Sequence, residues 1–230
     1  MRLATLSFVA SSLFGLGESM IQGFDMDAED FINWDDGFKD GARFATIRAT
    51  AGDIDIDERF ETSWSDAKEG GFIRGAYHEG VPAAGAGKEH AEFFLNHGGQ
   101  WIADNQTLPG TLHIQAPLDG DQCFGLNPNE TIQYLKDWTS TYFQATDQTP
   151  WLRIDLGWFD NCTDNWYSFP PDTMMSVIDA DDTPPIHHDL YITYGVSWDF
   201  WLQRKDYLYG GESQMFGGSL SLLKSRADGR

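Results

Sequence analysis

Residues 108–123 read LPGTLHIQAPLDGDQC, and the strand predicted inside this stretch decides how the rest of the chain is interpreted. After a Pro-Gly turn signal, residues 111–115 alternate between apolar and polar side chains, as a half-buried strand does. His113 and Gln115 therefore share one face, roughly 7 Å apart over two strand rises. Two functional groups at that spacing can act on opposite sides of one bond in a substrate. The alternative is a structural polar pair whose hydrogen bonds are satisfied inside the fold.

Predicted strands and helices alternate on both sides of this segment, which indicates an α/β fold. Further strands are expected over residues 41–50, 72–78 and 151–158. Helices are expected to begin at Asp57, to span residues 87–96, and to follow Asn127, an N-cap residue placed before a proline. Such alternation favours a parallel barrel, in which functional residues gather at the C-terminal ends of the strands.

Three segments resemble glycoside hydrolase family 25, the Chalaropsis-type lysozymes or N-acetylmuramidases. Residues 23–27 (GFDMD) resemble the family's first strand, residues 72–78 (FIRGAYH) match a later strand, and residues 108–115 resemble the family's LPGxLDIE strand. The resemblance is strong from residue 21 to residue 162 and weaker beyond. It implies an irregular, TIM-like (β/α) barrel in a single domain, residues 20–230, and a glycosidase that acts on peptidoglycan.

The resemblance also implies substitutions at the catalytic positions. The family's catalytic pair is Asp-x-Glu, and a gapless alignment places His113 and Gln115 there. Gln214 falls at a third acidic position, whereas Asp25 retains the acid of the first strand. Glutamine cannot donate a labile proton, and general acid catalysis is typically worth about 10²–10⁴-fold. Histidine cannot place a negative charge beside an oxocarbenium-like transition state.

Other side chains are expected to line the cleft that the resemblance implies. Tyr77 and His78 end a matching strand and are candidate sugar contacts, with a purely structural role as the alternative. Arg153, Asp155 and Trp201 are the remaining candidates for substrate binding. The side chains expected to converge at one end of the barrel are Asp25, Tyr77, His113, Gln115 and Arg153.

The N-terminus and the cysteines indicate secretion. Residues 1–19 combine an arginine, an apolar run and small residues, the pattern of a secretory signal peptide, and the run is too short for a convincing membrane span. Two cysteines in such a chain suggest one disulfide, and Cys123 and Cys162 both match cysteines of the family. Sequons, which permit N-glycosylation in a eukaryotic host, begin at Asn105, Asn129 and Asn161.

The formal net charge of −21 restricts the partners. An acidic surface repels nucleic acid and anionic membranes, and it also disfavours anionic bacterial walls. The adjacent His187 and His188 are more simply surface residues than metal ligands, so neither a metal nor a cofactor is expected. We expect a monomer that meets peptidoglycan or a related glycan.

Three interpretations follow from the sequence. The first is an inactive or impaired lysozyme-like protein that still binds a glycan. The second is an active muramidase with rearranged acids, which would combine Asp25 with Asp119, Asp121 or Asp155. The third is a secreted interaction protein that has lost sugar binding as well.

Overall fold

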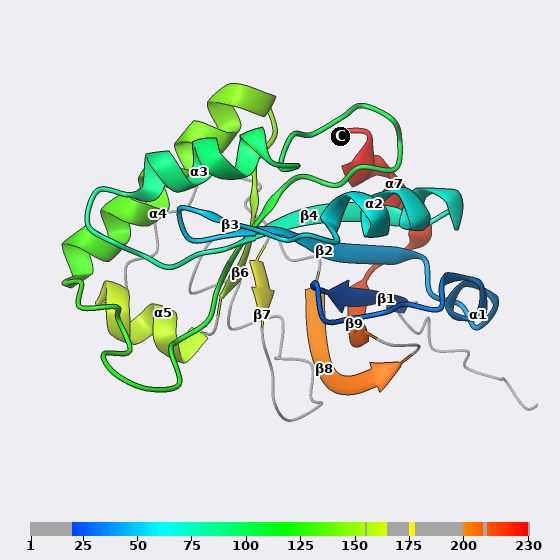
Figure 1. Cartoon of the computed structure of the whole chain (residues 1–230), viewed down its shortest axis with the longest axis horizontal. Helices are drawn as coiled ribbons and strands as arrows, with labels where there is room; N and C mark the ends of the chain where they lie inside the picture. The colour runs from blue at the N-terminus through cyan, green and yellow to red at the C-terminus, as the bar shows by residue number, and fades with distance from the viewer. Residues whose placement is uncertain (1–19, 155, 165–174, 178–199, 209–210, 230) are drawn as a thin grey trace, which may run out of the picture.

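The structure is a computed structural model that describes residues 20–154, 156–164, 175–177, 200–208 and 211–229 (Figure 1). Its strands are β1 (Met20–Met26), β2 (Phe44–Ala51), β3 (Asp55–Ile56), β4 (Ile73–Glu79), β5 (Thr111–Ile114), β6 (Trp151–Ile154), β7 (Met175–Val177), β8 (Phe200–Leu208) and β9 (Gly211–Gly217). Its helices are α1 (Trp34–Lys39), α2 (Phe60–Glu69), α3 (Gly87–Asn96), α4 (Pro128–Thr146), α5 (Leu156–Thr163) and α7 (Leu220–Ala227).

The strands form one curled, mainly parallel sheet in a single mixed α/β domain. Their order is β1-β9-β8-β7-β6-β5-β4-β2-β3, and β1 also pairs with β2. Strand β9 runs antiparallel to both of its neighbours, and β3 is a short antiparallel extension of β2. The predicted α/β class and parallel pairing are confirmed, but the antiparallel β9 departs from the regular alternation of a (β/α)₈ barrel.

Helix α4 shows why the sequence predicted its start correctly. The Asn127 side chain accepts the backbone N–H groups of Asn129 and Glu130, while Glu130 accepts the N–H of Asn127 in return. This reciprocal capping box satisfies donors that a helix start otherwise leaves open. Figure 1 shows α3 and α4 side by side on the outside of the sheet.

Aromatic side chains fill the space between the sheet and these two helices. Trp138 and Tyr142 of α4 are fully buried with parallel rings, and Phe94 of α3 stacks on Trp138. Gly110, in the turn before β5, approaches this stack so closely that its N–H donates to the Tyr142 hydroxyl at 2.6 Å. A Cβ at this position would lie 2.6 Å from the Tyr142 ring, so only glycine fits.

Two boundaries differ from the sequence predictions. The strand expected over residues 151–158 ends at Ile154, and α5 follows at once, with Trp158 buried on its inner side. The helix expected to begin at Asp57 begins at Phe60, because the Asp57 carboxylate instead accepts the N–H of Arg59 in a local turn.

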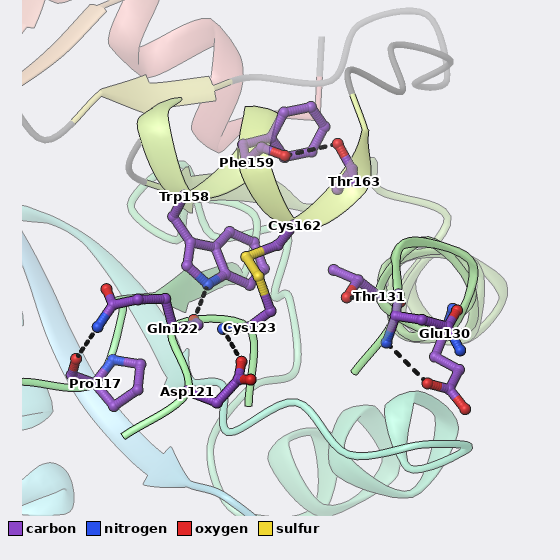
Figure 2. The surroundings of a disulfide bond; sticks show 11 residues. Pro117, Asp121, Gln122, Cys123, Glu130, Thr131, Trp158, Phe159, Cys162 and Thr163 are labelled. Atoms are coloured by element: carbon purple, nitrogen blue, oxygen red, sulfur yellow. Dashed lines mark hydrogen bonds between the residues drawn. A yellow bond between two sulfur atoms is a disulfide. The ribbon is translucent and has the colours of Figure 1, made fainter. Parts of the chain in front are cut away.

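The predicted disulfide is confirmed. Cys123 and Cys162 are bonded, which ties the loop after β5 to helix α5 (Figure 2). The indole N–H of Trp158 donates to the carbonyl of Gln122 at 2.7 Å, so the bridge and a hydrogen bond hold the same two segments. The loop after the central strand is thereby fixed to the body of the fold.

Several predictions fall outside the described residues, namely the signal peptide over residues 1–19, the role of Asp155, and the two histidines His187 and His188. Trp201 lies in β8, where its backbone is in register with Phe216 of β9. In the part of the chain that the structure describes, no helix is long and apolar enough to cross a membrane.

Candidate active site

Six buried polar side chains from six strands meet inside the curled sheet, and we call them the central cluster. Parallel registers place Asp25 opposite Thr46 and His113 opposite Arg153. The antiparallel pairing of β9 with β1 places Gln214 opposite Gly23. Each of these side chains is at most 7% exposed. The members of the central cluster are Asp25, Thr46, Tyr77, His113, Arg153 and Gln214.

Arg153 is the hub of the central cluster. Its Nη1 lies 2.7 Å from Oδ1 of Asp25, and its Nη2 lies 2.9 Å from Nδ1 of His113. Its guanidinium carbon is 4.5 Å from the centre of the Tyr77 ring, a cation–π distance. One buried cation therefore occupies the space between three residues that were expected to serve a substrate.

The side chain of Thr46 joins the other half of the cluster. Its hydroxyl donates to Oδ1 of Asp25 at 2.6 Å and lies 3.0 Å from Oε1 of Gln214. The same carboxylate oxygen thus receives both the threonine hydroxyl and the guanidinium of Arg153. Asp25 is consequently held in place by two hydrogen-bonding partners.

The electrostatics of the cluster follow from burial and from Arg153. Burial, followed by the Arg153 cation, lowers the pKa of His113 well below its usual value, so the imidazole is neutral. Because a guanidinium has no acceptor, Nδ1 of His113 must accept from it, and the ring proton sits on Nε2. Burial, followed by the Asp25 charge, raises the pKa of Tyr77 well above its usual value.

Arg153 keeps its positive charge although it is buried, because Asp25 lies beside it. Burial acts to lower the pKa of its guanidinium, but Asp25 and Tyr77 outweigh burial and leave the pKa above its usual value. Asp25 and Arg153 therefore cancel one another, and the four other members are neutral. The central cluster carries no net charge and presents no free carboxylate.

The structure separates two residues that the sequence had paired. His113 is buried in β5, whereas Gln115 follows the end of the strand and is exposed. The prediction that Asp25, Tyr77, His113 and Arg153 converge is confirmed by their contacts. Gln115 lies outside this set, directly after the C-terminal end of β5.

His78 is not part of the central cluster, and its place corrects the expectation of a sugar contact. It is fully buried, with Nδ1 2.8 Å from the hydroxyl of Thr50, and its ring stacks on Trp138. Burial, followed by the nearby His90, lowers the pKa of His78 to about 3. His78 is a core residue, since neighbours on a strand face opposite sides and Tyr77 faces inward.

Two residues of β2 near the candidate site, Thr46 and Arg48, were not among the residues predicted from the sequence. Thr46 belongs to the central cluster, and Arg48, two residues on, lies at the rim of the same inner face. Arg48 forms ion pairs with Asp27, Asp57 and Glu79 at 3.6, 3.3 and 3.1 Å. The period of two along residues 44–51 was the available signal for both.

A search of the described part of the chain finds no group of three His, Cys, Asp or Glu side chains placed to hold a metal ion. Three acids among the described residues, Asp27, Asp57 and Glu79, pair with Arg48. Two surface hollows lie elsewhere, one lined by Asn33 and Asp66 and the other by Leu95 and Trp101. Each member of the central cluster is buried in the part of the chain that the structure describes.

The model of "Glycosyl hydrolases family 25" matches residues 26–175. The chain belongs to glycosyl hydrolase family 25. Its relatives include Lysozyme M1 of Streptomyces globisporus, 31% identical over 216 residues that cover 91% of this chain and 72% of the relative. An N,O-diacetylmuramidase of Chalaropsis sp. is 29% identical over 216 residues, covering 91% of this chain and all of the relative.

Solved family 25 structures agree with this assignment. A family GH25 lysozyme from Aspergillus fumigatus superposes with a TM-score of 0.83 at 31% identity, covering 92% of this chain and 100% of the other. A muramidase from Acremonium alcalophilum gives a TM-score of 0.82 at 31% identity, covering 91% and 100%. The resemblance inferred from the sequence motifs is thereby confirmed at the level of the family 25 fold.

Proposed function

We propose that this family 25 chain does not hydrolyse glycans by two-carboxylate chemistry and acts by binding. The observation that carries the proposal is the ion pair between Asp25 and Arg153 at 2.7 Å, buried at 6% and 2% exposure. A retaining or inverting glycosidase needs one carboxyl group to protonate the leaving oxygen and a second to act as nucleophile or base. Within the central cluster Asp25 is the one carboxylate, and its charge is already balanced.

The other candidate groups that the structure describes do not replace the missing acid. His113 has a lowered pKa, and its Nδ1 is engaged by Arg153, so it does not carry a transferable proton near neutral pH. Gln115 and Gln214 have no ionisable proton. Asp119 and Asp121 lie exposed on the loop after β5, outside the buried cluster. These observations argue against the two rearranged pairs of the second interpretation that the structure describes, Asp25 with Asp119 and Asp25 with Asp121.

The binding role is proposed for a secreted glycoprotein, with residues 1–19 as its signal peptide and residues 20–230 as an irregular TIM-like barrel domain. Asn105, Asn129 and Asn161 are all exposed, as glycosylation requires. The ligand proposed is peptidoglycan or a related chitin-type glycan, because relatives are named lysozyme and N,O-diacetylmuramidase. We propose a monomer that binds neither nucleic acid nor membrane.

A second candidate function is a secreted interaction protein that has lost sugar binding. The placement of Tyr77 and His78 favours it, because both are at most 5% exposed and neither offers a free surface to a sugar. The ring of Tyr77 is covered by Arg153 at 4.5 Å, and that of His78 by Trp138.

A pelleting assay tests the proposal. The purified secreted protein is mixed with insoluble peptidoglycan or chitin, and the bound fraction is measured together with the turbidity of the suspension. We expect retention in the pellet without clearing. Clearing at a rate close to that of Lysozyme M1 would overturn the proposal, and absence from both pellets without clearing would leave the interaction protein as the function.

A further inference from the structure

Large apolar side chains are exposed on the segments that follow β1, β2, β4 and β5, including the short strand β3 that follows β2. Phe31 follows β1, Ile54 and Ile56 follow β2, Val81 follows β4, and Leu118 follows β5. Their exposed fractions are 71, 82, 49, 48 and 94% in that order. We call these five residues the apolar rim.

The five residues of the apolar rim lie at the same edge of the sheet, because the segments that carry them follow neighbouring parallel strands. Strands β1, β2, β4 and β5 pair in parallel in this order, so their C-terminal ends lie together. The guanidinium of Arg59 lies 3.6 Å over the ring of Phe31, which joins the first two loops. The N–H of Gly52 donates to the carbonyl of Glu79 at 3.0 Å, which joins the second loop to the third.

The segments that carry the apolar rim are rich in acidic residues, of which Asp57 is buried. Residues 27–33, 48–59, 79–86 and 115–126 contain ten carboxylates against two basic residues, Arg48 and Arg59. Arg48 is already paired with three of these carboxylates. The carboxylates on the four loops are Asp27, Glu29, Asp30, Asp53, Asp55, Asp57, Glu58, Glu79, Asp119 and Asp121.

We propose that the apolar rim is a docking surface for a protein partner whose contact face presents lysine or arginine around apolar side chains. Exposed apolar patches with a polar border mark interaction sites, because covering them removes apolar surface from water. The acidic border selects a cationic partner and repels an acidic one. This surface lies outside the central cluster, so the inference does not depend on the loss of hydrolysis.

The side-chain types favour a protein over other occupants. A sugar ring stacks on a flat aromatic face, but four members of the apolar rim are aliphatic, and one face of Phe31 is covered by Arg59. A second copy of the chain would bring two surfaces of the same sign together, in a molecule with a net charge of −21. Anionic lipid is repelled for the same reason.

The test uses the full secreted protein and a labelled amphipathic peptide of leucine and lysine as the probe, with binding read by fluorescence anisotropy. Two comparison peptides separate the contributions, one with serine for leucine and the other with glutamate for lysine. We expect saturable binding of the first peptide, binding weaker by at least about tenfold for the serine peptide, and no saturation with the glutamate peptide.

Paired variants locate the contact. Ile54→Ser with Leu118→Ser changes two highly exposed rim residues, whereas the control, Ile102→Ser with Phe143→Ser, changes exposed residues that precede β5 and β6. We expect the rim variant to weaken peptide binding by at least about tenfold and the control to stay within about twofold.

Equal binding by the rim variant and the wild type would overturn the proposal, as would equal affinity for the leucine and serine peptides. Chito-oligosaccharide binding that the rim variant alone loses would assign the surface to a glycan instead. Self-association that the same variant abolishes, seen by sedimentation equilibrium, would assign it to a second copy.

Discussion

Replacing Arg153 by methionine is the perturbation whose cost the structure defines best. The substitution removes the cation 2.7 Å from Asp25 and the donor to His113, and it leaves a carboxylate whose side chain is 8% exposed without its counter-ion. Breaking a buried pair by removing one partner costs about 3–5 kcal/mol, chiefly because the remaining charge stays desolvated. Asp25→Asn should cost a similar amount, because it leaves the guanidinium of Arg153 unpaired.

The double variant separates the ion pair from simple packing. With both charges removed, no uncompensated charge remains in the interior, so Asp25→Asn with Arg153→Met should be more stable than either single variant. The assay is urea unfolding followed by tryptophan fluorescence, with the disulfide intact. As the control, Lys39→Met breaks the exposed pair with Asp36 and should cost about 0–1 kcal/mol. The reasoning is refuted if the costs of the two single variants simply add.

The remaining predictions concern the core, the disulfide and the restoration of the site. The pKa of His78 is about 3 in the folded protein and about 6.5 in the unfolded chain, so the unfolded chain takes up the proton first and the free energy of unfolding falls as the pH drops, by up to about 3 kcal/mol at pH 4. When the free energy of unfolding is measured at pH 7 and at pH 4, His78→Gln should lose less stability between the two than the wild type. An equal loss of stability in both proteins would contradict the assignment. The double variant Cys123→Ser with Cys162→Ser should lower the free energy of unfolding by about 3–4 kcal/mol in the chain-entropy model, as measured by urea unfolding. A loss below about 1 kcal/mol, as small as that of a surface mutation, would count against a structural role for the disulfide. Gly110→Ala should destabilise by about 1–3 kcal/mol because its Cβ would meet Tyr142, and an unchanged melting midpoint would show that the turn can move. The triple variant His113→Asp, Gln115→Glu and Gln214→Asp, which restores the family's acids, should show muramidase activity only when Arg153→Met is added, because the guanidinium of Arg153 would otherwise pair with the new acids. Muramidase activity in the triple variant that keeps Arg153 would contradict this prediction.

Local sequence signals predicted the elements whose ends are set locally. The start of α4 follows from Asn127 and Glu130, which cap each other across three residues. The boundary between β6 and α5 was missed because residues 152–156 (LRIDL) keep alternating between apolar and polar side chains across Ile154, as a longer strand would. The range predicted for α3, residues 87–96, is confirmed in full.

The candidate site was predictable where strand alternation determines it. Tyr77 and His78 are adjacent on β4, so alternation shows that only one of them could face the central cluster, although it does not say which. Thr46 and Arg48 could have been found by the same rule. The contact between Arg153 and Asp25 could not, because it joins β6 to β1 across the interior and depends on the reach of one long side chain.

We propose that this family 25 chain has lost glycosidase chemistry, with the charge of Asp25 balanced by Arg153. Counting the reducing ends released from peptidoglycan by the wild type, by Asp25→Asn and by Lysozyme M1 tests this claim most directly. We predict that the wild type releases at least about 10²-fold fewer ends than Lysozyme M1 and no more than Asp25→Asn, since the general acid is missing. Release by the wild type that approaches the relative and disappears in Asp25→Asn would contradict the claim.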